Sequence, residues 1–298
     1  MKPDVINSHG SLNSRFAAWF VGVPARIYTR HCVYPVSKLY KLLPVRYITG
    51  AVTERLSHGI IAVAHSAKKN LTDMGIKKDK IRVIINGAEP LKAINLNERE
   101  ILKNSLGIEK DDIVVSIFAR LEPCKDHKSF LKAAALLTHS STNYKFLILG
   151  SGSIEHELKQ YARRLRVDKN VRFLGFVDDI APFMNITDIN VNCSIGTETS
   201  SLALSEGMSL GVPAVVSDYG GNPYMVSEGE NGYVYPQGDY GSLAMLIKRI
   251  AKMKGSEEYK SLSSGAYERY KNELNAKSMT EKTEEFYKEL YKRKKPRR

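Results

Sequence analysis

Short apolar runs alternate with stretches of helical periodicity along almost the whole chain, and this alternation limits the folds open to it. One of these runs, Ile113–Ala119 (IVVSIFA), is nearly all apolar. Strands of a parallel sheet have this character because helices cover both faces of the sheet. The regular order of strands and helices therefore predicts an α/β architecture in which helices flank parallel sheets.

Two series of elements are expected, separated by a polar connection from Pro90 to about Asn97. The first series has strands at Pro3–Ser8, Ala25–Thr29, Gly59–Ala64 and Ile81–Ile85, with helices at Leu12–Phe20, Val36–Leu56 (interrupted at Pro44) and Ala67–Met74 (capped by Ser66). The second series has strands at Ile113–Ala119, Lys145–Leu149, Val171–Leu174, Ile189–Cys193, Ala214–Ser217 and Tyr233–Tyr235, with helices at Glu98–Leu106, His127–Leu137, Ile154–Leu165, Ala181–Asn185, Leu243–Met253, Glu257–Glu273 and Ser278–Tyr291. A length of 298 residues suits two domains, which we place at residues 1–95 and 96–275.

The stretch Ser194–Gly221 reads as a strand end, a loop, a helix, a short turn and a strand. Thr199, Ser200 and Ser201 stand where we expect the helix to begin and can cap it. The first N–H groups of a helix lack an intrahelical partner, and its positive end suits a phosphate. Glu198 and Glu206 bracket this helix start, so a carboxylate is available on each side of a bound diphosphate.

The E-x7-E spacing of these acids, followed by G-x-P-x-V-x-S and D-x-G-G within Gly211–Gly221, resembles the signature of the retaining family-4 glycosyltransferases of the GT-B fold. The resemblance implies two Rossmann-like domains whose parallel sheets face a cleft. It also implies that residues 276–298 form a C-terminal helix that returns to the first domain, followed by a basic tail. In the family the first acid contacts the donor sugar and the second binds the ribose, roles that fall to Glu198 and Glu206. Two solvated acids on an amphipathic helix are the alternative.

Arg120 and Lys125 follow the first strand of the second series, where open α/β sheets bind ligands. An Arg offers a fork of donors and a Lys a point charge to phosphate oxygens. The family has an Arg-Leu followed closely by Lys here, and both cations hold the diphosphate. This chain departs from the family in having Asp126 where a Gly often follows the Lys. Two surface cations near a turn are the alternative.

Further donor contacts are implied by the resemblance alone. Gly150 and Gly152 match a glycine turn at which the family's backbone approaches the nucleotide, although an ordinary strand–helix turn explains them equally well. Phe176 and Val177 match the segment that holds the base through backbone groups, with a buried strand end as the alternative. The amides of the helix start are implied to bind the diphosphate and belong to Thr199, Ser200, Ser201 and Leu202.

Two histidines stand near strand ends of the first domain. His31 ends the second expected strand, and the family has a His there that reaches the donor sugar, so we assign it to the catalytic set with Glu198. His9 and Gly10 follow the first strand and are candidates for the acceptor side. A lone histidine is more often structural or simply exposed.

The formal net charge of +13 favours an anionic partner, and six of those charges lie in Lys292–Arg298 (KRKKPRR). We expect this tail either to dock on an anionic membrane surface or to be a disordered solubilising end. Elsewhere the cations are interspersed with acids and no aromatic-basic recognition motif occurs, which argues against nucleic acid. The three distant cysteines, the lack of a long apolar run and the lack of a signal-peptide core predict a cytoplasmic protein, peripheral on the membrane at most.

We therefore expect transfer of a hexose from a UDP- or GDP-sugar to a glycan or lipid-linked acceptor, with retention, in the synthesis of capsule, lipopolysaccharide or another cell-surface polysaccharide. No D-x-D and no ligand cluster occurs, so no metal and no cofactor beyond the nucleotide-sugar donor are expected. The family has further β-α units before the strand that PDVINS resembles. The resemblance thus predicts an incomplete, N-terminally truncated first domain with an open sheet edge. A non-catalytic protein that binds nucleotide sugars is the alternative.

Overall fold

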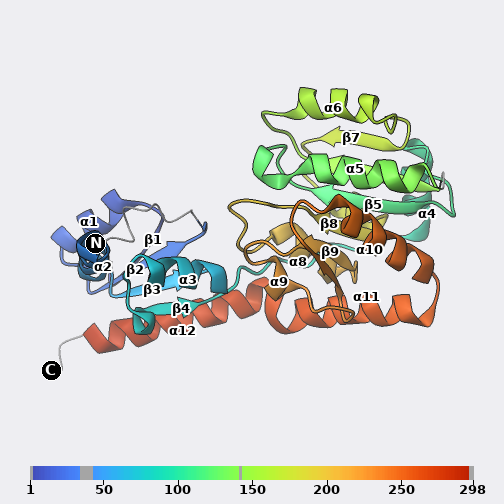
Figure 1. Ribbon diagram of the computed structural model, residues 1–298. Helices are drawn as coiled ribbons and strands as arrows, with labels where there is room; N and C mark the ends of the chain where they lie inside the picture. Colours follow the sequence, from blue (N-terminus) through green and yellow to red (C-terminus); the bar gives the residue numbers. More distant parts are fainter. Residues whose placement is uncertain (1–2, 34–42, 141–142, 295–298) are drawn as a thin grey trace. The chain divides into compact units, whose positions relative to one another are not determined.

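The computed structural model describes residues 3–33, 43–140 and 143–294 (Figure 1). The chain forms two compact units. The first comprises Met1–Gly87, Thr197–Ser200 and Ala276–Arg298, and the second comprises Ala88–Gly196 and Ser201–Asn275. Each unit has its own parallel sheet, which confirms the α/β architecture expected from the alternation of apolar runs and helical stretches.

The first unit is built on a four-stranded parallel sheet in the order β1-β2-β3-β4. Its elements are β1 (Val5–His9), α1 (Leu12–Phe20), β2 (Ala25–Arg30), α2 (Leu43–Leu56), β3 (Gly59–Ala62), α3 (His65–Asp73), a 3-10 turn η2 (Lys78–Lys80), β4 (Ile81–Val83) and α12 (Ala276–Lys294). The strand–helix order expected for this part of the chain is confirmed.

Two apolar cores lie on the two faces of this sheet because neighbouring residues of a strand point to opposite sides. Tyr28 and Ile60 belong to the core that contains Leu71 of α3. Ile27 and Ile61 belong to the core that contains Phe286 and Leu290 of α12. The C-terminal helix is therefore an integral part of the first unit.

Of two expectations for the helices of this unit, one stays a prediction and one is wrong. Pro44 lies in the first turn of α2, where a proline costs no hydrogen bond; the expected residues 36–42 lie outside the described ones, so an interruption at Pro44 stays a prediction. Ser66 does not cap α3, which begins at His65 with Ala64 in the N-cap position and no side-chain capping bond. The chain passes from β3 into the helix over two residues, so Ser66 is already inside the first turn.

The second unit is built on a six-stranded parallel sheet in the order β10-β9-β8-β5-β6-β7. The strands are β5 (Ile113–Phe118), β6 (Tyr144–Leu149), β7 (Val171–Gly175), β8 (Ile189–Asn192), β9 (Ala214–Ser217) and β10 (Gly232–Tyr235). The helices are α4 (Leu96–Ser105), α5 (His127–Thr138), α6 (Glu155–Arg164), α7 (Ala181–Asn185), α8 (Leu202–Ser209), α9 (Asn222–Met225), α10 (Tyr240–Met253) and α11 (Glu257–Arg269), with a 3-10 turn η3 (Pro123–Lys125) and a π-helical segment η4 (Tyr270–Leu274).

This order is that of a doubly wound, Rossmann-like sheet. From β5 the chain proceeds outward through β6 and β7, and then returns to place β8 on the other side of β5. Ligands bind outside the carboxyl ends of the strands at such a switch point. The topology therefore directs attention to the loops that follow β5 and β8.

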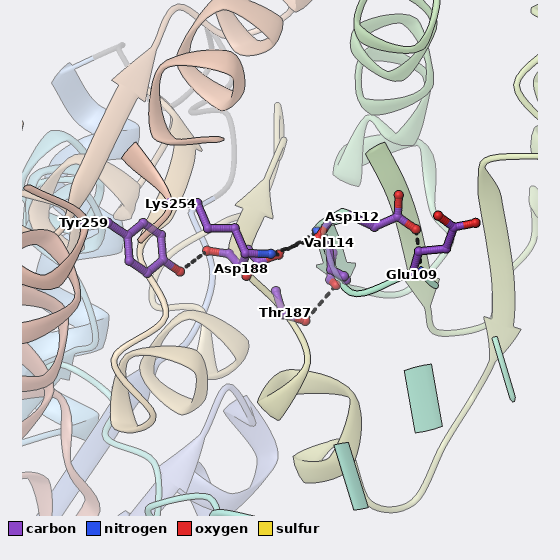
Figure 2. Close-up of polar contacts among 8 residues, drawn as sticks. Glu109, Asp112, Val114, Thr187, Asp188, Lys254 and Tyr259 are labelled. Atoms are coloured by element: carbon purple, nitrogen blue, oxygen red, sulfur yellow. Dashed lines mark hydrogen bonds and ion pairs between the residues drawn. The ribbon is translucent and has the colours of Figure 1, made fainter. Parts of the chain in front are cut away.

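At the opposite, amino ends of β5 and β8, a network of polar contacts holds the two strands together (Figure 2). The Asp188 carboxylate accepts a hydrogen bond of 2.8 Å from the backbone N–H of Val114. It also forms an ion pair with Lys254 Nζ at 2.8 Å. Lys254 also donates to the backbone oxygen of Asp112 at 2.8 Å, and the Tyr259 hydroxyl donates to the Asp188 backbone oxygen at 2.9 Å. The network ties both central strands to the segment between α10 and α11.

The first residue of α5, His127, is fully buried, and neither of its ring nitrogens has a hydrogen-bond partner among the described residues. Burial, with the nearby Lys125 as the second cause, lowers the pKa of His127 to about 4. The unfolded chain, with the ordinary value of 6.5, takes up this proton more readily than the folded chain does. Stability is therefore lost as the pH falls from about 6.5 towards 4.

We predict that the free energy of unfolding falls by about 1 kcal/mol per pH unit in that window because of His127 alone. The variant His127→Leu should flatten the slope, as measured by urea denaturation followed by circular dichroism between pH 7 and pH 4. The matched variant His139→Leu changes an exposed histidine that follows the same helix and should keep the wild-type slope. An unchanged slope in His127→Leu would contradict the prediction.

Candidate functional site

A cavity of about 240 Å³ opens in the second unit at the carboxyl ends of β5, β6 and β7, beside α8. Its lining comes from four separate segments and consists of Phe118, Ala119, Arg120, Leu149, Gly150, Ser151, Phe176, Val177, Ile180, Ala203 and Glu206. Most of these side chains are apolar, while one cation and one carboxylate add charge. An apolar pocket with a few converging polar groups at a switch point is the usual form of a ligand site in such sheets.

Five residues expected from the sequence as donor contacts line this one cavity: Arg120, Gly150, Phe176, Val177 and Glu206. They come from the ends of three strands and from a helix, so the strand order of the sheet brings them together. Four others in this unit, Lys125, Gly152, Ser201 and Leu202, are not among the described residues that line it.

The loop that carries Arg120 is held against the loop that follows β6. Ala119 donates a backbone hydrogen bond of 3.0 Å to Leu149, and Leu121 donates one of 3.0 Å to Ser151. Arg120 lies between these two bonds and is exposed. Its guanidinium is thus anchored through the backbone at the rim of the cavity and is accessible to an anion.

Gly150 and Gly152 allow these two loops to approach each other. A Cβ on Gly150 would lie 2.1 Å from the backbone oxygen of Ala119, and one on Gly152 would lie 2.3 Å from that of Leu121. Gly150 also has φ +134°, outside the range that L side chains favour. Both glycines therefore serve the packing of the turn, and Gly150 is in addition part of the cavity wall.

Glu206 projects from α8, and its side chain is half-buried, so burial raises the pKa of its carboxyl above the usual value. The helix begins at Leu202, later than expected. Ser201 occupies the N-cap position but makes no side-chain capping hydrogen bond. The prediction that Ser or Thr side chains cap this helix is therefore wrong for Ser201.

The two residues before Ser201 hold the backbone of the first unit. The Thr199 hydroxyl donates a 2.7 Å hydrogen bond to the backbone oxygen of His31, and the Ser200 hydroxyl accepts a 3.1 Å bond from the Asn86 N–H. Glu198 is buried, and its carboxylate accepts a 3.2 Å bond from the Thr199 N–H. The two acids of the E-x7-E motif thus belong to different units, Glu198 to the first and Glu206 to the second.

Asp126, the departure from the family's Gly, has a structural explanation. Its backbone is left-handed, with φ 45°, a conformation that glycine adopts freely and aspartate tolerates. Its carboxylate caps α5 by accepting a 3.3 Å bond from the Ser129 N–H and a 2.5 Å bond from the Ser129 hydroxyl. Lys125 ends the short turn η3 just before this cap and is partly buried.

His9 and His31 meet in the first unit at the carboxyl ends of β1 and β2. The distance from His9 Nδ1 to His31 Nε2 is 2.6 Å, and the two rings are nearly parallel, 16° apart, with centroids 4.9 Å apart. Burial, and then the neighbouring His9, lower the pKa of His31. Gly10 follows in the turn after β1 with φ 76°. The sequence did not predict this pairing, nor the 3.4 Å approach of Asn7 Nδ2 to His9 Nε2, although Asn7 and His9 share one face of β1 by their spacing of two.

Residues 3–33, 43–140 and 143–294 contain no group of three or more His, Cys, Asp or Glu side chains able to hold a metal ion. The same residues form no helix of the length and apolar character needed to cross a membrane.

Comparison with known proteins agrees with this geometry. A family model described as glycosyl transferases group 1 matches residues 98–269, and one described as glycosyltransferase family 4 matches residues 1–90. Anabaena Alr3699/HepE, solved in complex with UDP, superposes with a TM-score of 0.85 at 21% identity, over 96% of this chain and 79% of that chain.

Two curated relatives are also similar. The chain is 27% identical over 265 residues to the Escherichia coli UDP-Gal:alpha-D-GlcNAc-diphosphoundecaprenol alpha-1,3-galactosyltransferase, covering 84% of this chain and 66% of that one. It is 30% identical over 220 residues to the uncharacterized glycosyltransferase MJ1607 of Methanocaldococcus jannaschii, covering 71% and 56%. The chain thus spans between half and two thirds of the length of these curated relatives.

Two Rossmann-like units with parallel sheets, and a cavity at the switch point of the second, define a protein of the GT-B fold. One family model matches more than half of the sequence, so the chain belongs to the glycosyl transferases group 1 family. The resemblance drawn from the E-x7-E stretch is confirmed at this level.

Because Gly150 has no room for a side chain, we predict that Gly150→Ala lowers the free energy of unfolding by about 2–3 kcal/mol, through strain and separation of the two loops. The control Gly241→Ala places its methyl group at the exposed start of α10, 3.3 Å from the Asp239 carboxylate, and should be nearly neutral. Chemical denaturation of both variants measures the difference. Equal stabilities would show that the loops separate at no cost.

Proposed function

We propose that the cavity of the second unit binds a nucleotide-sugar donor, and that the protein transfers the hexose of this donor to a glycan or lipid-linked acceptor. The observation that supports this most directly is the presence of Arg120 and Glu206 in one cavity at the switch point of a doubly wound sheet. The names of the relatives agree, since one is a galactosyltransferase that uses UDP-Gal and another was solved with UDP.

Five of the lining residues have a role in this proposal. Arg120 offers several N–H donors to the diphosphate, and Glu206 accepts hydrogen bonds from the ribose hydroxyls. Phe176, 73% exposed at the rim, offers an aromatic face to the base. Val177 is proposed to offer backbone groups to the base, and Gly150, whose N–H donates to the Gly175 oxygen at 2.7 Å, forms part of the cavity wall beside the nucleotide.

In the transfer step, the bond between the anomeric carbon and the diphosphate oxygen breaks, and a bond to an acceptor oxygen forms. The acceptor hydroxyl passes its proton to an oxygen of the departing nucleoside diphosphate, which develops negative charge as its bond to the sugar breaks. We assign stabilisation of that charge to Arg120, to Lys125 and to the amides near Thr199–Leu202. Glu198 and His31 are proposed to orient the sugar, with retention at the anomeric carbon.

We further propose a role in cell-surface polysaccharide synthesis in the cytoplasm, close to an anionic membrane surface. A capsular glycosyltransferase of Staphylococcus aureus is 23% identical over 96% of this chain and 77% of its own length, which supports the polysaccharide class. The basic segment Lys292–Arg298 supports the membrane surface, with Lys292 and Arg293 exposed and residues 295–298 outside the described ones.

We predict that UDP or GDP and their sugars raise the melting temperature, because a ligand that binds the folded state stabilises it. The variants Arg120→Ala and Glu206→Ala should each weaken nucleotide binding by about tenfold or more, the effect of losing a hydrogen bond to a charged group. Thermal shift titration and calorimetry measure both effects.

The controls Arg163→Ala and Glu268→Ala remove exposed charges of the same unit and should bind like the wild type. If no nucleotide stabilises the wild type, or if all four variants bind alike, the proposed site is wrong. Release of free hexose or transfer from the bound donor then tests catalysis. Binding without any turnover would favour the alternative of a non-catalytic protein that binds nucleotide sugars.

A further inference from the structure

We propose that His9 is a positioning residue which, together with Asn7, holds the ring of His31 in a single tautomer with its proton on Nδ1. The consequence for the donor sugar rests on the proposed function, but the tautomer itself does not. All the groups involved belong to the first unit and lie on β1, β2, the residue after β2, and α12 (Figure 1).

The register of the sheet brings these groups together. In the parallel pair of β1 and β2, His9 lies opposite Thr29. Side chains two residues apart on a strand share one face, so Asn7 and His9 stand in a row on β1. His31 follows Thr29 by two residues, which places its ring beside that of His9.

Asn7 sets the direction of the hydrogen bonds. Its Oδ1 accepts a 2.9 Å bond from the Thr29 hydroxyl, and its Nδ2 donates a 2.7 Å bond to the Tyr287 hydroxyl on α12. The same Nδ2 lies 3.4 Å from His9 Nε2. An amide nitrogen can only donate, so with the Asn7 amide oriented in this way His9 Nε2 is the unprotonated acceptor, and the proton of the neutral ring lies on Nδ1.

The constraint then passes to His31. His9 Nδ1–H faces His31 Nε2 at 2.6 Å, so His31 Nε2 accepts and the His31 proton lies on Nδ1. The opposite tautomer would direct a His9 Nε2–H at the Asn7 N–H group, donor against donor. The lowered pKa of His31 agrees with this arrangement, because it favours the neutral ring that these hydrogen bonds require.

A neutral His31 held in this way has one donor, Nδ1–H, for a further partner, and its other nitrogen is occupied. It can donate to a sugar hydroxyl or a phosphate oxygen. It cannot accept a proton as a general base while the bond from His9 persists. His31 is therefore suited to orienting a substrate oxygen, and the acceptor hydroxyl must lose its proton to another group.

The test is long-range ¹H–¹⁵N NMR of the ¹⁵N-histidine-labelled chain at pH 8.5, which distinguishes protonated from unprotonated ring nitrogens. We expect the wild-type His31 to show only the Nδ1–H form. In His9→Phe, which keeps an aromatic ring but lacks the donor, we expect a mixture of both tautomers. In His9→Asn, whose amide can donate from the position of Nδ1, the single form should return.

Two further variants complete the design. Asn7→Asp replaces the donor that faces His9 by an acceptor. It should therefore reverse the direction of both hydrogen bonds and move the His31 proton to Nε2. His65→Phe changes an exposed histidine of the same unit and should leave the His31 signals unchanged. A wild-type His31 protonated on Nε2, or an unchanged tautomer in both Asn7→Asp and His9→Phe, would overturn the inference.

Turnover is measured separately. If the proposed function holds, His9→Phe should lower kcat about tenfold, the effect of one misdirected hydrogen bond, and His9→Asn should recover most of it. Should the chain prove inactive, the NMR result still decides on the tautomer. The failure of the proposed function and the failure of this inference are therefore distinguishable.

Discussion

The candidate donor site depends on one pairing, that of β5 with β8 in the middle of the six-stranded sheet. From this pair the chain proceeds to β6 on one side and to β9 on the other, so the loops after the central strands diverge. The network around Asp188 holds the amino ends of the pair together, and the divergence opens the carboxyl ends. Without this order of strands, Arg120 and Glu206 would not line one cavity.

Close backbone approach is the second requirement of this site. The loops after β5 and β6 touch at Gly150 and Gly152, where a single methyl group would collide with a backbone oxygen. The contact determines where Arg120 stands, because its two neighbours, Ala119 and Leu121, are hydrogen-bonded to the second loop. A glycine turn that the sequence associates with a nucleotide is thus, in the first place, a spacer between two loops.

In the first unit the C-terminal helix contributes to the surroundings of the histidine pair. α12 covers one face of the sheet through Phe286 and Leu290, and Gly59 leaves room for both side chains. The same helix carries Tyr287, which receives the hydrogen bond from Asn7. A segment distant in the sequence therefore contributes to the environment of His31, and the orientation of that ring depends on tertiary packing.

Local pattern alone determined the elements of this protein: the limits of α1, the apolar strands β5 and β6, and the parallel α/β class follow from periodicity within a few residues. The E-x7-E motif likewise indicated the family. Tertiary structure decided the rest. The start of α8 after Ser201, the place of Pro44 inside α2, the left-handed Asp126 and the contact of His9 with His31 all depend on which segments pack together. The physical reason is range: hydrophobic period and helix propensity act between near neighbours, whereas a site is made by strand order and by contacts between residues far apart in the chain.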